Sequence, residues 1–172
     1  MKKLSHAVVD TNVLLIANQQ HQGVSPECVF ACVEWLELLR ERGCTVLDHG
    51  YEVLGEYRNK TTPNTGNRVG DAFLKWLYQN MGNAQRVSFV SIEKHPERGY
   101  AGFPNDPALA EFDPADRKFV AVAAAHPNKP PILQGSDAKW LEWSGILDLH
   151  GIQVSFLCPA DVRRSMKRKR SG

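Results

Sequence analysis

The chain has few cysteines, no long apolar run and no cluster of histidines, and these scarcities exclude several classes of protein. No apolar run approaches the ~20 residues that span a bilayer, and the N-terminus MKKLSHAVVD lacks a signal-peptide pattern, so we expect a cytoplasmic protein with no membrane partner. The four cysteines form no CxxC pair and have no histidine at zinc-ligand spacing. Cys28 and Cys32 lie four residues apart on one face of a predicted helix. We therefore expect reduced thiols in the core.

Positive charge is concentrated near the C-terminus. The chain has 172 residues, enough for one domain with a substantial core, and residues 163–170 hold six of its 21 lysines and arginines. The rest of the chain has 15 basic and 19 acidic residues, so its formal net charge is negative. We expect a domain over residues 1–159 and a basic, disordered tail over 160–172. This tail is either a solvated terminus or a contact for a nucleic-acid backbone, with Arg168 as a candidate.

Short apolar segments alternate with helical patterns along the whole chain. We expect strands near residues 7–9, 44–47, 87–92, 130–134 and 152–156. Ser25 and Pro26 form a helix start, and Gly43 is placed to end that helix. Such alternation predicts an α/β fold with a mainly parallel sheet of about five strands, covered by helices on both faces.

Residues 93–113 form a long segment rich in proline and glycine, with Tyr100 and Phe103 among them. A long loop within one compact domain is usually functional or mobile. We expect it to contact a substrate or a partner.

Four acids are placed at strand ends or helix starts, and these share one edge of a parallel sheet. They are Asp10, Glu56, Asp116 and Asp137. Two carboxylates about 4 Å apart repel by roughly 4 kcal/mol at an effective dielectric near 20, so raised pKa values or divalent cations must offset the repulsion. Oxygen ligands favour Mg²⁺ or Mn²⁺, and such sites suit phosphodiester hydrolysis. Glu52, one turn from Glu56, is an alternative inward acid, whereas Asp48 and Asp113 are interpreted as helix caps.

Four motifs surround these acids: Val9-Asp10-Thr11-Asn12-Val13-Leu14, Leu54-Gly55-Glu56-Tyr57, Asp113-Pro114-Ala115-Asp116-Arg117-Lys118-Phe119-Val120-Ala121 and Gly135-Ser136-Asp137. Taken together and in this order, they resemble a PIN-domain ribonuclease. The resemblance extends from about Ser5 to Pro159. The resemblance implies a three-layer α/β/α sandwich and metal-dependent cleavage of single-stranded RNA. It also implies one or two Mg²⁺ or Mn²⁺ ions held by Asp10, Glu56, Asp116 and Asp137. Asn12 and Ser136 would orient these ligands. The 93–113 loop is longer than compact toxins of the family need. This length argues against a toxin–antitoxin role and does not affect the nuclease interpretation.

Other roles and partners remain open from the sequence. Arg117 and Lys118, beside Asp116, either face the scissile phosphate or are solvated charges. A PIN-like module that binds RNA or protein without cleaving is one alternative function. A haloacid-dehalogenase phosphatase is another, but it needs an acid two residues after the first one, where this chain has Asn12. RNA is the expected partner, and an antitoxin or other protein inhibitor and a homodimer stay open.

Overall fold

The computed structural model describes residues 5–172, so residues 1–4 of the expected domain lie outside the described part. A sheet of five parallel strands forms its centre, in the order β3-β2-β1-β6-β7. The strands are β1 (His6–Val9), β2 (Cys44–Asp48), β3 (Val87–Val90), β6 (Ile132–Gln134) and β7 (Val154–Phe156). Ala7, Val8 and Val9 are fully buried, as expected for a central parallel strand covered on both faces. The predicted α/β class and parallel sheet are confirmed.

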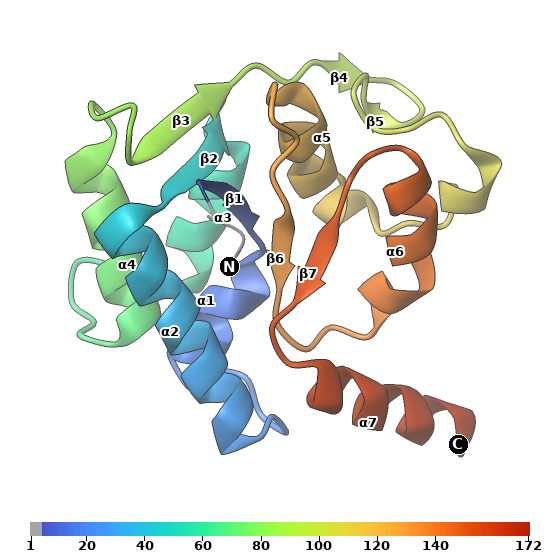
Figure 1. The fold of residues 1–172 in the computed structure, drawn as a ribbon, viewed down its shortest axis with the longest axis horizontal. Coiled ribbons are helices and arrows are strands. Elements are labelled where there is room, and N and C mark those ends of the chain that lie inside the picture. Colours follow the sequence, from blue (N-terminus) through green and yellow to red (C-terminus); the bar gives the residue numbers. More distant parts are fainter. Residues whose placement is uncertain (1–4) are drawn as a thin grey trace.

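Helices cover both faces of this sheet (Figure 1). They are α1 (Thr11–Ala17), α2 (Pro26–Arg42), α3 (Glu52–Lys60), α4 (Val69–Asn80), α5 (Arg117–Ala125) and α6 (Lys139–Leu149). Helices α1, α2 and α4 pack against one another, while α5 packs against β1, β2 and β6, and α6 packs against β7. The fold is therefore the expected three-layer α/β/α sandwich. No helix within residues 5–172 is long and apolar enough to cross a membrane.

The order of the strands creates a switch point beside β1. From β1 the chain proceeds to β2 and β3 on one side, and then returns to place β6 and β7 on the other side of β1. Crossovers that leave in opposite directions open a crevice at the carboxyl ends of the two strands where the order reverses. Here these strands are β1 and β6, and they end just before Asp10 and Gly135.

The segment from residue 93 to 113 is ordered and packed on the domain, and this corrects part of the sequence-based interpretation. It forms a hairpin of β4 (Lys94–His95) and β5 (Gly99–Tyr100), followed by a 3-10 turn, η1 (Pro107–Leu109). Tyr100 and Phe103 are buried in the core, so the predicted contact of Tyr100 with a substrate is wrong.

Arg117 explains how this segment is held. Its guanidinium donates hydrogen bonds to the carbonyl oxygens of Arg98, Ala110 and Phe112, and lies 4.7 Å from the centre of the Phe103 ring. The side chain is buried and its donors are directed to the backbone. Arg117 is therefore a structural anchor, and neither role left open by the sequence, a contact with the scissile phosphate or a solvated charge, agrees with its buried position.

The basic C-terminal tail was expected to be disordered, but it forms helix α7 (Pro159–Arg170). Pro159 occupies the first turn, where its missing N–H costs nothing. Two links hold the start of α7 to the start of α2. The Asp161 carboxylate accepts hydrogen bonds of 2.7 Å from both the backbone N–H and the hydroxyl of Ser25, and a disulfide joins Cys28 to Cys158.

This disulfide corrects the expectation of reduced thiols for Cys28 and Cys158. Cys32 and Cys44 are free and buried, as expected. The bonded cysteines are 130 residues apart, so no local spacing in the sequence could indicate their pairing.

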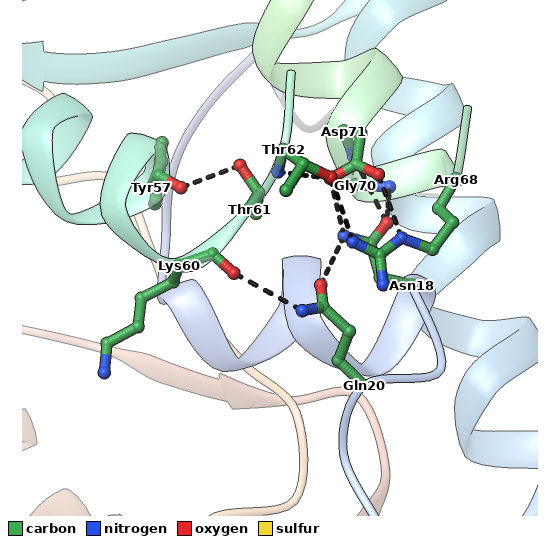
Figure 2. Close-up of polar contacts among 9 residues, drawn as sticks. All are labelled: Asn18, Gln20, Tyr57, Lys60, Thr61, Thr62, Arg68, Gly70 and Asp71. Carbon is green, nitrogen blue, oxygen red and sulfur yellow. Dashed lines mark hydrogen bonds and ion pairs between the residues drawn. The ribbon is translucent and has the colours of Figure 1, made fainter. Parts of the chain in front are cut away.

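A buried polar network joins the end of α1 to the start of α4 (Figure 2). Asp71, fully buried, accepts hydrogen bonds from the Thr62 backbone N–H at 2.8 Å, Asn18 Nδ2 at 3.1 Å and Arg68 Nε at 2.9 Å. The Asn18 carbonyl oxygen in turn accepts from the Gly70 N–H at 2.6 Å. Burial alone would raise the pKa of Asp71, but the hydrogen bonds from Thr62, Arg68 and Asn18 outweigh it and lower the pKa.

Substitution of this carboxylate tests the network. We expect Asp71→Asn to lower the free energy of unfolding by about 1–3 kcal/mol, because it removes an acceptor of charge-assisted hydrogen bonds. Since the folded pKa of Asp71 is lowered, its contribution is complete above the ordinary carboxyl pKa of about 3.9 and is lost as the pH falls through the folded value. Urea unfolding at neutral and acidic pH measures both effects. Asp148→Asn, at an exposed position on α6, is the control, and equal loss in both variants would contradict the account.

The disulfide gives a second prediction. We expect two reactive thiols per chain, Cys32 and Cys44, when the protein is purified without reductant and unfolded in guanidinium. Reduction should raise the number to all four cysteines and lower the free energy of unfolding by about 2–4 kcal/mol, because the bond closes a long loop. Four thiols before reduction would show that the bond does not form.

Candidate active site

Four acids predicted from the sequence gather at the switch point of the sheet. Asp10 follows β1, Asp137 lies three residues after the end of β6, Glu56 lies in α3, and Asp116 ends the 3-10 turn η2 (Pro114–Asp116) that leads into α5. The charges of Glu56, Asp116 and Asp137 each raise the pKa of Asp10, so all three lie within electrostatic reach of that carboxyl. The predicted convergence is therefore present in the structure.

Asp10 is the most buried of the four, with 5% of its surface exposed. Its carboxylate accepts a hydrogen bond of 2.8 Å from the Asn12 backbone N–H and so caps α1, while its own N–H donates to the Leu133 carbonyl oxygen of β6. Burial is the main cause that raises the pKa of Asp10 to about 8; the charges of Asp116, Glu56 and Asp137 add to it, and the Asn12 N–H opposes it. A bound cation would stabilise the ionised form that this environment disfavours.

The pKa of Asp116 is also raised, but less than that of Asp10. Burial and the charges of Asp113, Asp137 and Glu56 raise its pKa to about 6, whereas the Lys139 ammonium acts in the opposite direction. Lys139 lies 3.1 Å from an Asp113 oxygen and 3.9 Å from an Asp137 oxygen. It bridges the starts of η2 and α6, a role that the sequence analysis missed because the two segments are distant in the chain.

Glu56, rather than Glu52, is the acid of α3 that faces the site. Glu56 accepts a hydrogen bond of 2.6 Å from the Thr11 hydroxyl and forms an ion pair with Lys118. Glu52 instead pairs with Lys94 at 2.9 Å on the surface. Lys118, which is largely buried, thus places its ammonium beside the acids, and Thr11 is a supporting residue that the sequence analysis did not identify.

Asn12 and Ser136 connect the two strand ends. The Asn12 side-chain oxygen accepts a hydrogen bond of 3.1 Å from the Ser136 backbone N–H, which links the loop after β1 to the loop after β6. Asn12 lies two residues after Asp10, and Ser136 directly precedes Asp137. The contact therefore ties together the two loops that carry Asp10 and Asp137, and the orienting role expected for Asn12 and Ser136 stays a prediction.

Tyr57 is a further residue that supports the site. Its hydroxyl donates a hydrogen bond to the carbonyl oxygen of Val9, directly before Asp10. Burial, together with the charges of Asp10, Glu56 and Asp48, raises the pKa of Tyr57 well above its usual value. Tyr57 therefore stays neutral and keeps its proton for this contact.

Asp48 and Asp113 act as helix caps, as predicted. Asp48 accepts hydrogen bonds from the backbone N–H groups of Glu52 and Val53 at 2.9 and 3.0 Å. Asp113 accepts from the Ala115 N–H at 3.0 Å. Neither carboxylate is left free as an additional ligand.

The four acids offer the type of ligand atom that hard divalent cations prefer. Carboxylate oxygens alone are available from the four acids, and Mg²⁺ and Mn²⁺ prefer such ligands. Among the residues described, the group of three ligand atoms that lie within 4.8 Å of one another consists of Cys28, Cys32 and Cys158. No three of the four carboxylates therefore bring oxygens within 4.8 Å of one another, and the ammonium groups of Lys118 and Lys139 lie beside Glu56 and Asp137.

Comparisons of the chain with protein-family models, with curated proteins and with solved structures found no match. The resemblance to PIN-domain ribonucleases therefore stays a hypothesis that rests on the motifs. The site geometry is the independent basis for the function proposed below.

Gly135 gives a test of this geometry. A Cβ atom at Gly135 would lie within 3.0 Å of Asn12 Oδ1 and Ile16 Cδ1, so Gly135→Ala must displace the Asn12 side chain. We expect a loss of about 1–3 kcal/mol in the free energy of unfolding. Gly145→Ala is the matched control: an added Cβ meets nothing within 4 Å there, and alanine in a helix should stabilise by about 0.5–1 kcal/mol. Equal effects of the two variants on the free energy of unfolding in urea would contradict the close packing of Asn12 against Gly135.

Proposed function

We propose that the protein is a Mg²⁺- or Mn²⁺-dependent endoribonuclease of the PIN-like type that hydrolyses single-stranded RNA. The convergence of Asp10, Glu56, Asp116 and Asp137 at the switch point supports this proposal most strongly. The charges of Glu56, Asp116 and Asp137 raise the pKa of Asp10, and those of Glu56 and Asp137 raise the pKa of Asp116. Such a cluster is unfavourable unless a cation or protons neutralise it, and cation-binding carboxylate sites commonly serve phosphoryl chemistry.

The four acids would hold one or two cations. A bound cation supplies Lewis-acid chemistry: it makes water more acidic and neutralises charge on the phosphate. Asp10 and Asp137 would be ligands from the two central strand ends, and Glu56 and Asp116 from the neighbouring helices. Products with 5′-phosphate and 3′-hydroxyl ends are expected.

The remaining side chains would position these ligands and the substrate. Thr11 and Lys118 fix the Glu56 carboxylate, and Asn12 ties the Asp10 segment to Ser136. The Lys118 ammonium, beside Glu56, would contact a substrate phosphate, which is one of the two roles that the sequence leaves open. Arg117 has no part in this because its donors bind backbone carbonyl groups.

A PIN-like module that binds without cleaving is the competing function, and the presence of all four acids favours the enzyme. A phosphatase of the haloacid-dehalogenase kind is disfavoured, because Asn12 stands where the general acid is required and binds the Ser136 N–H instead. A toxin role, an antitoxin or other inhibitor, a homodimer and a cytoplasmic location stay predictions. The disulfide bears on the location, since such bonds are rare in the cytosol.

Asp10→Asn tests the proposed activity. We expect cleavage of labelled single-stranded RNA in Mn²⁺ to fall by more than about 100-fold, because loss of residues that only orient ligands already costs roughly 10–100-fold. Calorimetric titration with Mn²⁺ should show a site in the wild type and not in the variant. Stability should hold or rise, since an amide keeps the cap to Asn12 and removes a buried like charge.

Asp148→Asn, with the same chemical change at an exposed position, should cleave as the wild type does. Cleavage that persists in Asp10→Asn, or in the wild type with excess EDTA, would overturn the proposed mechanism. Binding of RNA by a wild type that shows no Mn²⁺ site would favour the binding module.

A further inference from the structure

A polar groove of about 600 Å³ lies between helix α7 and the loop that joins α1 to α2. Its lining includes His21, Gln22, Ser25, Ser136, Arg164 and Arg168. Ser136 is shared with the candidate active site, because its N–H binds Asn12 and the next residue is Asp137. The groove therefore borders the loop after β6 that also carries Asp137, although none of the four acids lines it.

The α7 side of this groove carries positive charge. Arg164 and Arg168 are one helical turn apart, line the groove and are exposed. Within residues 5–172, Arg168 has no carboxylate within 4.0 Å, whereas Arg164 lies 2.8 Å from an Asp161 oxygen. A guanidinium offers a planar set of donors that matches a phosphate, so two on one helix face can bind successive groups of a backbone.

Two acids also line the groove, Glu27 and Asp161. Burial alone would raise the pKa of Asp161, but hydrogen bonds from Ser25 and the Arg164 guanidinium hold it below the usual range, so the carboxylate stays ionised and is paired with Arg164. Glu27 lies in the first turn of α2, where the helix dipole favours an acid. Neither acid cancels the charge of Arg168.

The groove is held open by the links between its walls. Ser25 caps α2 and also donates two hydrogen bonds to Asp161 of α7, and the Cys28–Cys158 disulfide joins the same two helices. A surface that is already ordered loses less entropy when it binds a ligand. Its polar lining suits a charged backbone better than the apolar centre of a protein interface.

We propose that this groove binds the backbone of single-stranded RNA next to the scissile phosphate, with Arg164 and Arg168 contacting its phosphates. The inference rests on the proposed function, because the acids define where the strand is cut. The predicted contact of a disordered tail with nucleic acid thus becomes a contact of an ordered helix. Only Arg164 and Arg168 among the basic residues of α7 are assigned to it, because they line the groove.

Charge-neutralising substitutions on two faces of α7 test the groove. We expect Arg164→Gln/Arg168→Gln to raise the Kd for labelled oligouridylate by about tenfold and to lower the slope of log K against log salt by about 1.4, since each phosphate contact on a single strand contributes about 0.7. Arg163→Gln/Lys167→Gln is the matched control: it removes the same charge, also one turn apart, but neither residue lines the groove. Its Kd should change by less than about twofold.

Binding is measured by fluorescence anisotropy in EDTA, so it does not depend on cleavage. Arg168→Gln alone, which breaks no ion pair of the described chain, should show about half of the change in slope and guards against an effect on folding. Equal effects of the two double variants, or tighter binding of duplex than of single-stranded RNA, would overturn the inference. If the wild type cleaves RNA in Mn²⁺ while both double variants bind RNA equally well, the proposed RNA-binding groove is wrong and the proposed nuclease activity is supported. If the groove binds RNA but no cleavage occurs, the proposed activity fails.

Discussion

The arrangement of side chains at the carboxyl ends of β1 and β6 depends on how the mutual repulsion among four carboxylates is offset. Asp10 is nearly fully buried, and its surroundings raise its pKa to about 8, while the pKa of Asp116 rises to about 6. Two ammonium groups, of Lys118 and Lys139, and the hydroxyl of Thr11 offset part of this repulsion. A purely structural site would gain stability from replacing such acids, and this is why we propose a function that uses a cation.

The fold supplies the precision of this arrangement through short links between distant segments. The reversal of strand order beside β1 places the loops after β1 and β6 next to each other. Asn12 joins these loops through the Ser136 N–H, and Gly135 provides the space in which the amide fits. Tyr57 of α3 binds the carbonyl group directly before Asp10. The backbone beside Asp10 and Asp137 is thus fixed by contacts that do not involve the carboxylates themselves.

Patterns that act over a few residues were predictable, and contacts between distant residues were not. The Ser25–Pro26 start and Gly43 end defined α2, because capping depends on local chemistry. Strand ends located Asp10 and Asp137, and helical segments located Glu56 and Asp116. The Cys28–Cys158 bond and the Lys139 bridge join residues far apart in the chain, so no spacing indicates them. The buried roles of Tyr100 and Arg117 also depend on how the 93–113 segment packs. Charge density alone suggested disorder for α7, where Asp161 and the disulfide provide anchors that composition does not show.

A crystal of the protein soaked in Mn²⁺ tests the central claim most directly, because manganese is identified by its anomalous scattering. The account predicts an anomalous peak at the carboxyl ends of β1 and β6, bounded by carboxylate oxygens of Asp10, Glu56, Asp116 and Asp137. A fully soaked crystal with no peak among these acids, or with manganese bound only elsewhere, would contradict it.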